Sequence, residues 1–245
     1  MWPDRVTGTV QLSDVDSLAN YWAKYADDSS ELWADPARRT ITAILDAHHP
    51  NGGGRLPLAS GQDSSLQARW QQHRAIVQLQ LSDVLKAWMA ASNKALSQEE
   101  FGELIEDYVG YIADPPAADL KELVSDLEVV AHQEFKTGVR LKTGARRLQF
   151  TETVEGRTKE GSVEIPDTLT IKVPIWQGAH TATPITARLR FRANTPRAGQ
   201  VALIYKLDGL REILDGAFLA ALDGLTEALA DGNDNTVVIY RGTPA

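Results

Sequence analysis

The fold of this chain is decided by residues 184–208, which read PITARLRFRANTPRAGQVALIYKLD. In the first half of this stretch, arginines alternate with leucine and phenylalanine. The three arginines are Arg188, Arg190 and Arg192. Because successive side chains of a strand point to opposite faces, the alternation predicts a strand with one basic face and one apolar face. Residues 194–199 contain Asn, Pro and Gly, which favour a turn, and residues 201–207 are typical of a returning strand. We therefore expect a hairpin.

The rest of the chain changes character near residue 134. From there to residue 207, apolar residues recur with period two between glycines, which predicts an antiparallel meander. A capping box at Ser97–Glu100 marks one of several predicted helices upstream. Residues 208–230 have the apolar spacing of a long helix, and residues 236–240 of a last strand. Segregated runs of helices and strands favour the α+β class: an antiparallel sheet packed by helices, with a mixed α/β N-terminal part.

This pattern predicts a mainly helical, mixed α/β part at residues 1–133. It predicts an antiparallel sheet with a C-terminal helix and strand at residues 134–245, and we expect the two parts to form one continuous globular unit. Within the first part we expect a helix at 13–26, strands at 32–33, 40–45 and 70–81, a glycine-rich loop at 50–65, and helices that begin at Ser82, Ser97 and Asp119. The helix that begins at Ser97 is expected to continue to Ile112.

The composition limits the classes of function. The chain has 245 residues, no cysteine and a formal net charge of -8. Without cysteine there are neither disulfides nor thiolate metal sites, which suits a reducing cytosol. We see neither a signal peptide nor an apolar run long enough to cross a bilayer, so we expect a cytoplasmic protein that does not contact membranes.

The charge is unevenly distributed along the chain. Residues 133–207 hold 13 Lys and Arg against 6 Asp and Glu, whereas the segments on either side are both acidic. A basic block between acidic flanks indicates an anionic partner, or an acidic surface of the same chain or of a second copy that covers it. The same separation of charge would suit a homo-oligomer.

Several short motifs carry a family resemblance. They are Thr40–Leu45 with His48, Trp70–Ala75, Trp88, Gln98–Phe101 with Leu104–Asp107, Phe135–Gly144 and the basic hairpin. In this order they resemble the YfdQ-like family of phage and prophage proteins, a family of unknown function. This chain has Gln72 where the family pattern would place an acidic residue before the histidine. The resemblance implies a phage context near recombination functions, and it supplies no catalytic residue.

The arginine row is the leading candidate site. Guanidinium groups pair bidentately with phosphate oxygens, so the row predicts an anion-binding or nucleic-acid-binding face. Arg147 and Lys172 extend this face if their strands are neighbours. The alternatives are a solvated sheet face or one covered by acidic helices. We expect no recognition of specific bases, because the chain has no recognition helix, zinc finger or aromatic RNA-binding signature.

A second candidate is a metal site. Asp46 and His48 alternate at a predicted strand end, and His73 would join them only through the fold. Carboxylate and imidazole both bind transition metals, but two neighbouring ligands are more typical of a polar strand end. The chain also has no phosphate-binding loop, dinucleotide fingerprint or nucleophile elbow. We therefore expect no cofactor, no metal and no catalytic residue.

These observations lead to three hypotheses. The first is a non-enzymatic phage accessory protein of DNA recombination or replication. It would bind nucleic acid, or a protein that handles nucleic acid, through the basic face. The second is a protein-interaction module that inhibits or diverts a host enzyme or defence factor. The third is a metal-dependent enzyme centred on Asp46, His48 and His73.

Overall fold

The computed structural model describes residues 6–27, 30–47, 71–130, 134–140, 146–154, 157–192, 202–230 and 237–244. Side chains are described outside residues 126–164. The chain forms two compact units. The first unit comprises Met1–Gln80 and Arg211–Ala245, and the second comprises Leu81–Leu210. The second unit is therefore inserted into the first, and these units divide the chain at different places from the division expected at residue 133.

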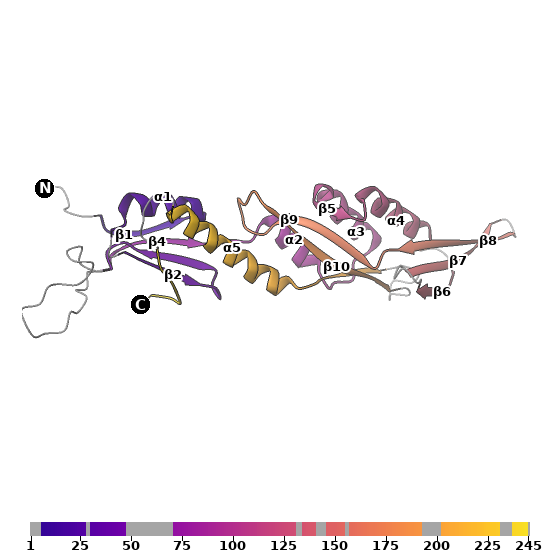
Figure 1. Ribbon diagram of the computed structural model, residues 1–245. Helices are drawn as coiled ribbons and strands as arrows, with labels where there is room; N and C mark the ends of the chain where they lie inside the picture. Colours follow the sequence, from indigo (N-terminus) through magenta and orange to yellow (C-terminus); the bar gives the residue numbers. More distant parts are fainter. Residues whose placement is uncertain are drawn as a thin grey trace, which may run out of the picture. The chain divides into compact units, whose positions relative to one another are not determined.

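The first unit contains a mixed five-stranded sheet (Figure 1). Its strands lie in the order β1 (Gly8–Leu12), β4 (His73–Gln78), β3 (Thr40–Ile44), β2 (Glu31–Asp35) and β12 (Ile239–Arg241). The edge strands β1 and β12 pair in parallel with β4 and β2, and the inner pairs are antiparallel. Since β3 forms a hairpin with β2, the two strands expected at residues 32–33 and 40–45 are confirmed.

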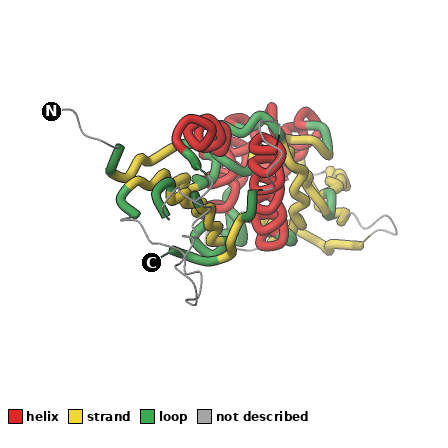
Figure 2. Tube along the Cα trace, turned by 60° about the vertical axis from the view of Figure 1, so that its left-hand side comes forward, coloured by secondary structure: helices red, strands yellow, loops and turns green. Residues whose placement is uncertain are grey.

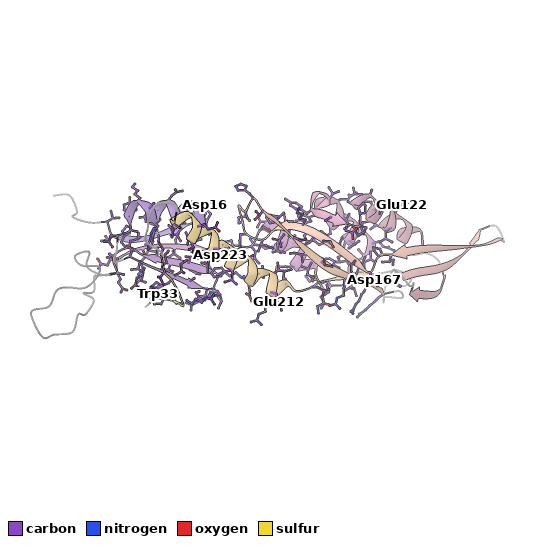
Figure 3. The ribbon with its side chains drawn as sticks, in the orientation of Figure 1. Asp16, Trp33, Glu122, Asp167, Glu212 and Asp223 are labelled. Atoms are coloured by element: carbon purple, nitrogen blue, oxygen red, sulfur yellow. The ribbon has the colours of Figure 1, made fainter. Side chains whose placement is uncertain are left out.

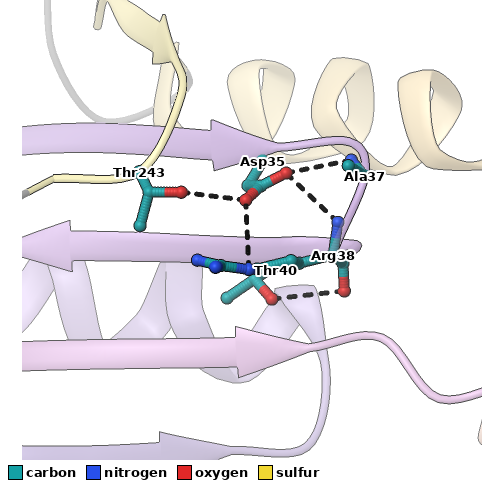
Figure 4. A network of polar contacts seen from close by, with 5 residues as sticks. All are labelled: Asp35, Ala37, Arg38, Thr40 and Thr243. Carbon is teal, nitrogen blue, oxygen red and sulfur yellow. Dashed lines mark hydrogen bonds and ion pairs between the residues drawn. The ribbon is translucent and has the colours of Figure 1, made fainter.

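Two helices cover this sheet, α1 (Val15–Tyr25) and α5 (Leu210–Ala230). In Figure 4 both are visible behind the strands. The Asp14 side chain caps α1 by accepting the backbone N–H of Ser17. Leu18 of α1 is fully buried, as are Ile41 and Val77 of the sheet. Alternate residues of β4 are buried, whereas β3 is buried continuously from Ile41 to Ile44.

A polar network holds the β2–β3 turn against the C-terminal segment (Figure 4). The Asp35 carboxylate accepts hydrogen bonds from the backbone N–H groups of Ala37 and Arg38, at 2.9 and 3.1 Å. It also accepts one from the Thr243 hydroxyl at 2.8 Å. The bond from Thr243 is the largest cause of a lowered pKa of Asp35. The bonds that Asp35 accepts from Ala37 and Arg38 stabilise the turn locally. The bond from Thr243 connects residues that are 208 positions apart in the sequence.

The second unit contains two antiparallel sheets. One has the order β11 (Ala202–Leu207), β10 (Ala182–Arg192), β9 (Thr168–Pro174) and β5 (Ile112–Asp114). The other has the order β6 (Glu134–Arg140), β7 (Arg146–Val154) and β8 (Arg157–Ile165). The strands expected after residue 134 are confirmed, and they are distributed over two sheets.

The helices of the second unit are α2 (Asp83–Ala91), α3 (Gln98–Asp107) and α4 (Ala117–Val130), which Figure 2 colours red among yellow strands. Trp88 of α2 is fully buried against Tyr205 of β11, and the Tyr205 hydroxyl donates to the Trp88 carbonyl at 2.6 Å. Helix α2 also contacts β9, and α3 contacts β11. The helices therefore pack on one face of this sheet. The α+β class is confirmed.

One helix is shorter than expected. The capping box of Ser97 and Glu100 starts α3 as predicted, but the helix ends at Asp107. A 3₁₀ turn at Val109–Tyr111 and strand β5 follow. Ile112 pairs with Ile171 of β9, so the sheet satisfies backbone groups that the helix would have used. Val109 is exposed, so it does not continue the buried stripe of α3.

Candidate anion-binding site

The three arginines lie on one exposed face of β10. Arg188, Arg190 and Arg192 are exposed, and Leu189 between them is buried at 2% exposure. Leu189 and its alternate neighbours Ala187 and Ile185 point into the core under the helices. The arginines consequently share the face of the sheet that is opposite to the face on which α2 and α3 pack.

Strands β9 and β11 add two lysines to this face. Lys206 of β11 lies directly opposite Arg188, and Lys172 of β9 lies opposite Pro184, four residues before Arg188. Both lysines are exposed. We define the basic face as Lys172, Arg188, Arg190, Arg192 and Lys206. Sequence reasoning included Lys172 but missed Lys206, although the period-two pattern of residues 201–207 contained the signal. Its position became clear only with the register of the hairpin.

An ion pair ends this row of cations. The Arg188 guanidinium donates two hydrogen bonds to the Asp208 carboxylate, from Nε to Oδ2 at 2.7 Å and from Nη2 to Oδ1 at 2.6 Å. This bond lowers the pKa of Asp208 and raises that of Arg188. Lys206 and Arg190 lie close enough to lower the pKa of Asp208 further. Asp208, two residues ahead of α5, thus neutralises Arg188.

Arg190, Arg192 and Lys206 differ from Arg188 in this respect. Within the described part of the chain, Arg190, Arg192 and Lys206 form neither an ion pair nor a side-chain hydrogen bond. They line a depression of about 300 Å³. The complete lining is Asn93, Ala95, Arg188, Arg190, Phe191, Arg192, Ile204 and Lys206. The backbone N–H of Asn93 donates to the carbonyl of Tyr205, which fixes this segment beside β11.

Other acidic residues of this unit include some on the helices and one beside β10, where the Asp167 carbonyl accepts the N–H of Leu189 at 2.8 Å. In Figure 3 Glu122 is on α4, in the helical layer, and Asp167 is just ahead of β9. Asp208 is the one carboxylate in the described residues that binds a cation of the basic face. Three cations that line a depression, and that bind no carboxylate among the described residues, can bind an anion, because guanidinium and ammonium groups offer several hydrogen-bond donors.

Arg147 does not belong to the same sheet. It lies in β7 and pairs with Glu164 of β8, in the three-stranded sheet. Its side chain lies outside the described residues. From the sequence, Arg147 was expected to extend the basic face if its strand were a neighbour of β10. Strands β7 and β10 belong to different sheets, so Arg147 is not a strand neighbour of Arg188.

The metal-site candidates have structural partners. The Asp46 carboxylate accepts the backbone N–H groups of Gln72 and His73, at 3.0 and 2.9 Å. Nε2 of His73 lies 2.8 Å from the Tyr21 hydroxyl, and the His73 ring packs edge-on against Tyr21 and Tyr25. The fold does bring Asp46 and His73 together, with both carboxylate oxygens bound to backbone. His48 lies outside the described residues, among which no group of three metal-ligating side chains occurs.

The fold and the site together define a class: an α+β protein of two units whose second unit exposes a basic sheet face. The chain belongs to the DUF2303 family of uncharacterized conserved proteins, whose family model matches residues 2–244. No curated protein and no solved structure matches it. Among the described residues, none of the helices combines the length and the apolar character that a bilayer span requires.

Proposed function

We propose that this protein is a non-enzymatic accessory factor that binds the phosphate backbone of nucleic acid through the basic face. The observation that carries the proposal is the set of three cations, Arg190, Arg192 and Lys206, around one depression without carboxylate partners among the described residues. Guanidinium groups match phosphate oxygens in geometry and keep their charge at every physiological pH. Phosphate contacts of this kind provide affinity without recognition of sequence.

The context of this activity comes from the resemblance to YfdQ-like phage and prophage proteins. That resemblance supports a role in phage DNA recombination or replication, in the cytoplasm of a bacterial host. A chain without cysteine is compatible with that reducing compartment. The acidic total charge of -8 supports a local contact made by one face, since a protein that coats DNA would be basic overall.

A salt series tests the proposal. Fluorescence anisotropy of labelled single-stranded and duplex DNA would be measured from low to physiological salt. Binding should weaken steeply with salt, because contacts to phosphates release counterions. The double variant Arg190→Ala with Arg192→Ala should reduce affinity at low salt by about tenfold or more. It should also reduce the magnitude of the slope of log K against log salt by ~1.4 to ~1.8.

The matched control is Lys86→Ala with Lys121→Ala. These two exposed lysines belong to α2 and α4 of the same unit and pair with Asp83 and Glu106. The control removes the same number of positive charges and should leave both affinity and slope nearly unchanged. Equal losses in the two double variants, or no binding at low salt, would contradict the proposal. A host protein that is still captured after nuclease treatment would then favour the protein-interaction alternative.

A further inference from the structure

We infer that the basic face binds one phosphodiester strand, aligned with β10, and that its preferred ligand is single-stranded nucleic acid. This inference rests on the proposed function and deepens it by naming the form of the ligand. It is carried by the arrangement of the cations on β10 and β11 and by the position of Asp208.

At Arg190 and Arg192 the cations of the basic face form a single row. Alternate residues of a strand are about 7 Å apart, so Arg190 and Arg192 follow each other at a spacing comparable to that of successive phosphates in an extended single strand. Their neighbours on β11 are uncharged, because Arg190 lies opposite Ile204 and Arg192 opposite Ala202. The pairing of β10 with β9 ends at Arg188. The row is therefore one residue wide at these two arginines.

A duplex has a different pattern of charge. Its two phosphate rows border grooves that are about 6 and about 12 Å wide, so a protein surface that crosses a groove needs cations in two rows. The basic face has no second row beside Arg190 and Arg192 in β9 to β11. The depression has a volume of about 300 Å³, which is enough for a small group such as a nucleotide. It is too small to accommodate a duplex.

Asp208 determines where the row ends. Its carboxylate holds Arg188 in a bidentate pair, so a phosphate at Arg188 would meet a neutralised guanidinium and a neighbouring negative charge. The cations of the depression that pair with no carboxylate among the described residues are then Arg190, Arg192 and Lys206, which can contact about three phosphates. Asp208 is a positioning residue that fixes Arg188 and limits the contacts at this end.

We expect the basic face to bind nucleic acid without recognising individual bases. Two aromatic residues belong to these strands: Tyr205 is buried, and Phe191 is half-buried at the lining of the depression, so no fully exposed aromatic ring stands on β9, β10 or β11. Proteins that stack bases use exposed aromatic side chains for that purpose. Binding should therefore be independent of sequence, and single strands of DNA and RNA should bind about equally, because the cations contact phosphates alone.

The experiment uses the full chain and three probes: a labelled oligothymidine, an oligouridine of the same length and a duplex of that length. Single strands should bind several-fold more tightly than the duplex. The slope of log K against log salt for oligothymidine should be about -2, from three phosphates at ~0.7 each. Arg192→Ala should reduce the magnitude of this slope by ~0.7. Asp208→Asn releases Arg188 from its ion pair, so it should increase the magnitude of the slope by ~0.7 and tighten binding.

The outcomes separate this inference from the proposed function. Duplex binding that equals or exceeds single-strand binding overturns the inference and leaves the proposed function intact, whereas binding of neither probe overturns both. A strong preference for one sugar, or an Asp208→Asn slope equal to that of the wild type, also overturns the inference. Lys86→Ala, which removes a lysine from α2, should leave all slopes unchanged, and thermal denaturation checks that each variant is folded.

Discussion

At the scale of single residues, burial decides whether a polar side chain acts as a ligand or as part of the core. His73 is 5% exposed, and its ring contacts Tyr21 and Tyr25. Burial lowers the pKa of His73, and the nearby Asp46 carboxylate opposes this effect in part. In the sequence, His73 lies three residues after Trp70 and directly before Arg74. Only the packing of α1 on β4 shows that its ring is enclosed between tyrosines.

This burial predicts a pH dependence of stability. The pKa of His73 is lower in the folded state than in the unfolded chain, where it is about 6.5, so the unfolded chain binds the proton more readily. The free energy of unfolding should be highest above that pH and should fall as the pH decreases from about 7 to about 5. Urea denaturation at a series of pH values measures this change.

The variant His73→Gln should flatten the pH dependence. The matched control is His180→Gln, because His180 is exposed and should leave the pH dependence as it is in the wild type. If His73→Gln keeps the full slope between these pH values, another group is responsible for it.

At the scale of elements, local signals determine where helices begin, and sheet pairing determines where some of them end. Ser97 and Glu100 form both hydrogen bonds of a capping box, from Glu100 N–H to Ser97 Oγ at 3.1 Å and from Ser97 N–H to Glu100 Oε2 at 2.7 Å. Ser82 similarly caps α2 and also donates to the Pro174 carbonyl. These caps were predicted from sequence because their partners lie within three residues.

The capping box gives a prediction for α3. Ser97→Ala should lower the free energy of unfolding by about 1 kcal/mol, because the first turn of the helix loses the acceptor for the Glu100 N–H group. Urea denaturation of the full chain measures the change. Glu103→Ala, an exposed position further along the same helix, is the control and should change stability by less than about 0.5 kcal/mol. Equal effects of the two substitutions would show that the box does not stabilise the helix.

At the scale of the whole molecule, the two compact units divide the chain differently from its composition. Composition changes near residue 134, where helices give way to strands. The second unit instead begins at Leu81 and includes α2 and α3, whose core residues pack with those of β9 to β11. Trp88 and Tyr205, 117 residues apart in sequence, are one such contact.

This division predicts which fragment folds alone. Residues 81–210 should unfold in a single cooperative urea transition, seen by the fluorescence of buried Trp88, because the fragment retains both the sheet and its helices. Residues 134–245, the part that composition would isolate, lack Trp88 and strand β5 and should show no cooperative transition. A cooperative 134–245 fragment together with an unfolded 81–210 fragment would reverse this conclusion.

Much of the local structure follows from the sequence. Period two predicted β10 and the common face of Arg188, Arg190 and Arg192, and Ser82 and Ser97 marked the starts of α2 and α3. The end of α3 could not be predicted in this way, because it depends on the pairing of Ile112 with Ile171. Lys206 was missed as a member of the basic face for a similar reason, since the cross-strand register is a long-range property.

By itself, the sequence determined the alternation that sends three guanidinium groups to one side of a strand, because the pleat of a β-strand is a property of neighbouring residues. Only the tertiary structure decided which of those groups is neutralised. Asp208 reaches Arg188 across 20 residues once β11 returns beside β10, whereas Arg190 and Arg192 face Ile204 and Ala202. Contacts between residues distant in sequence depend on register and packing, which a local pattern does not contain.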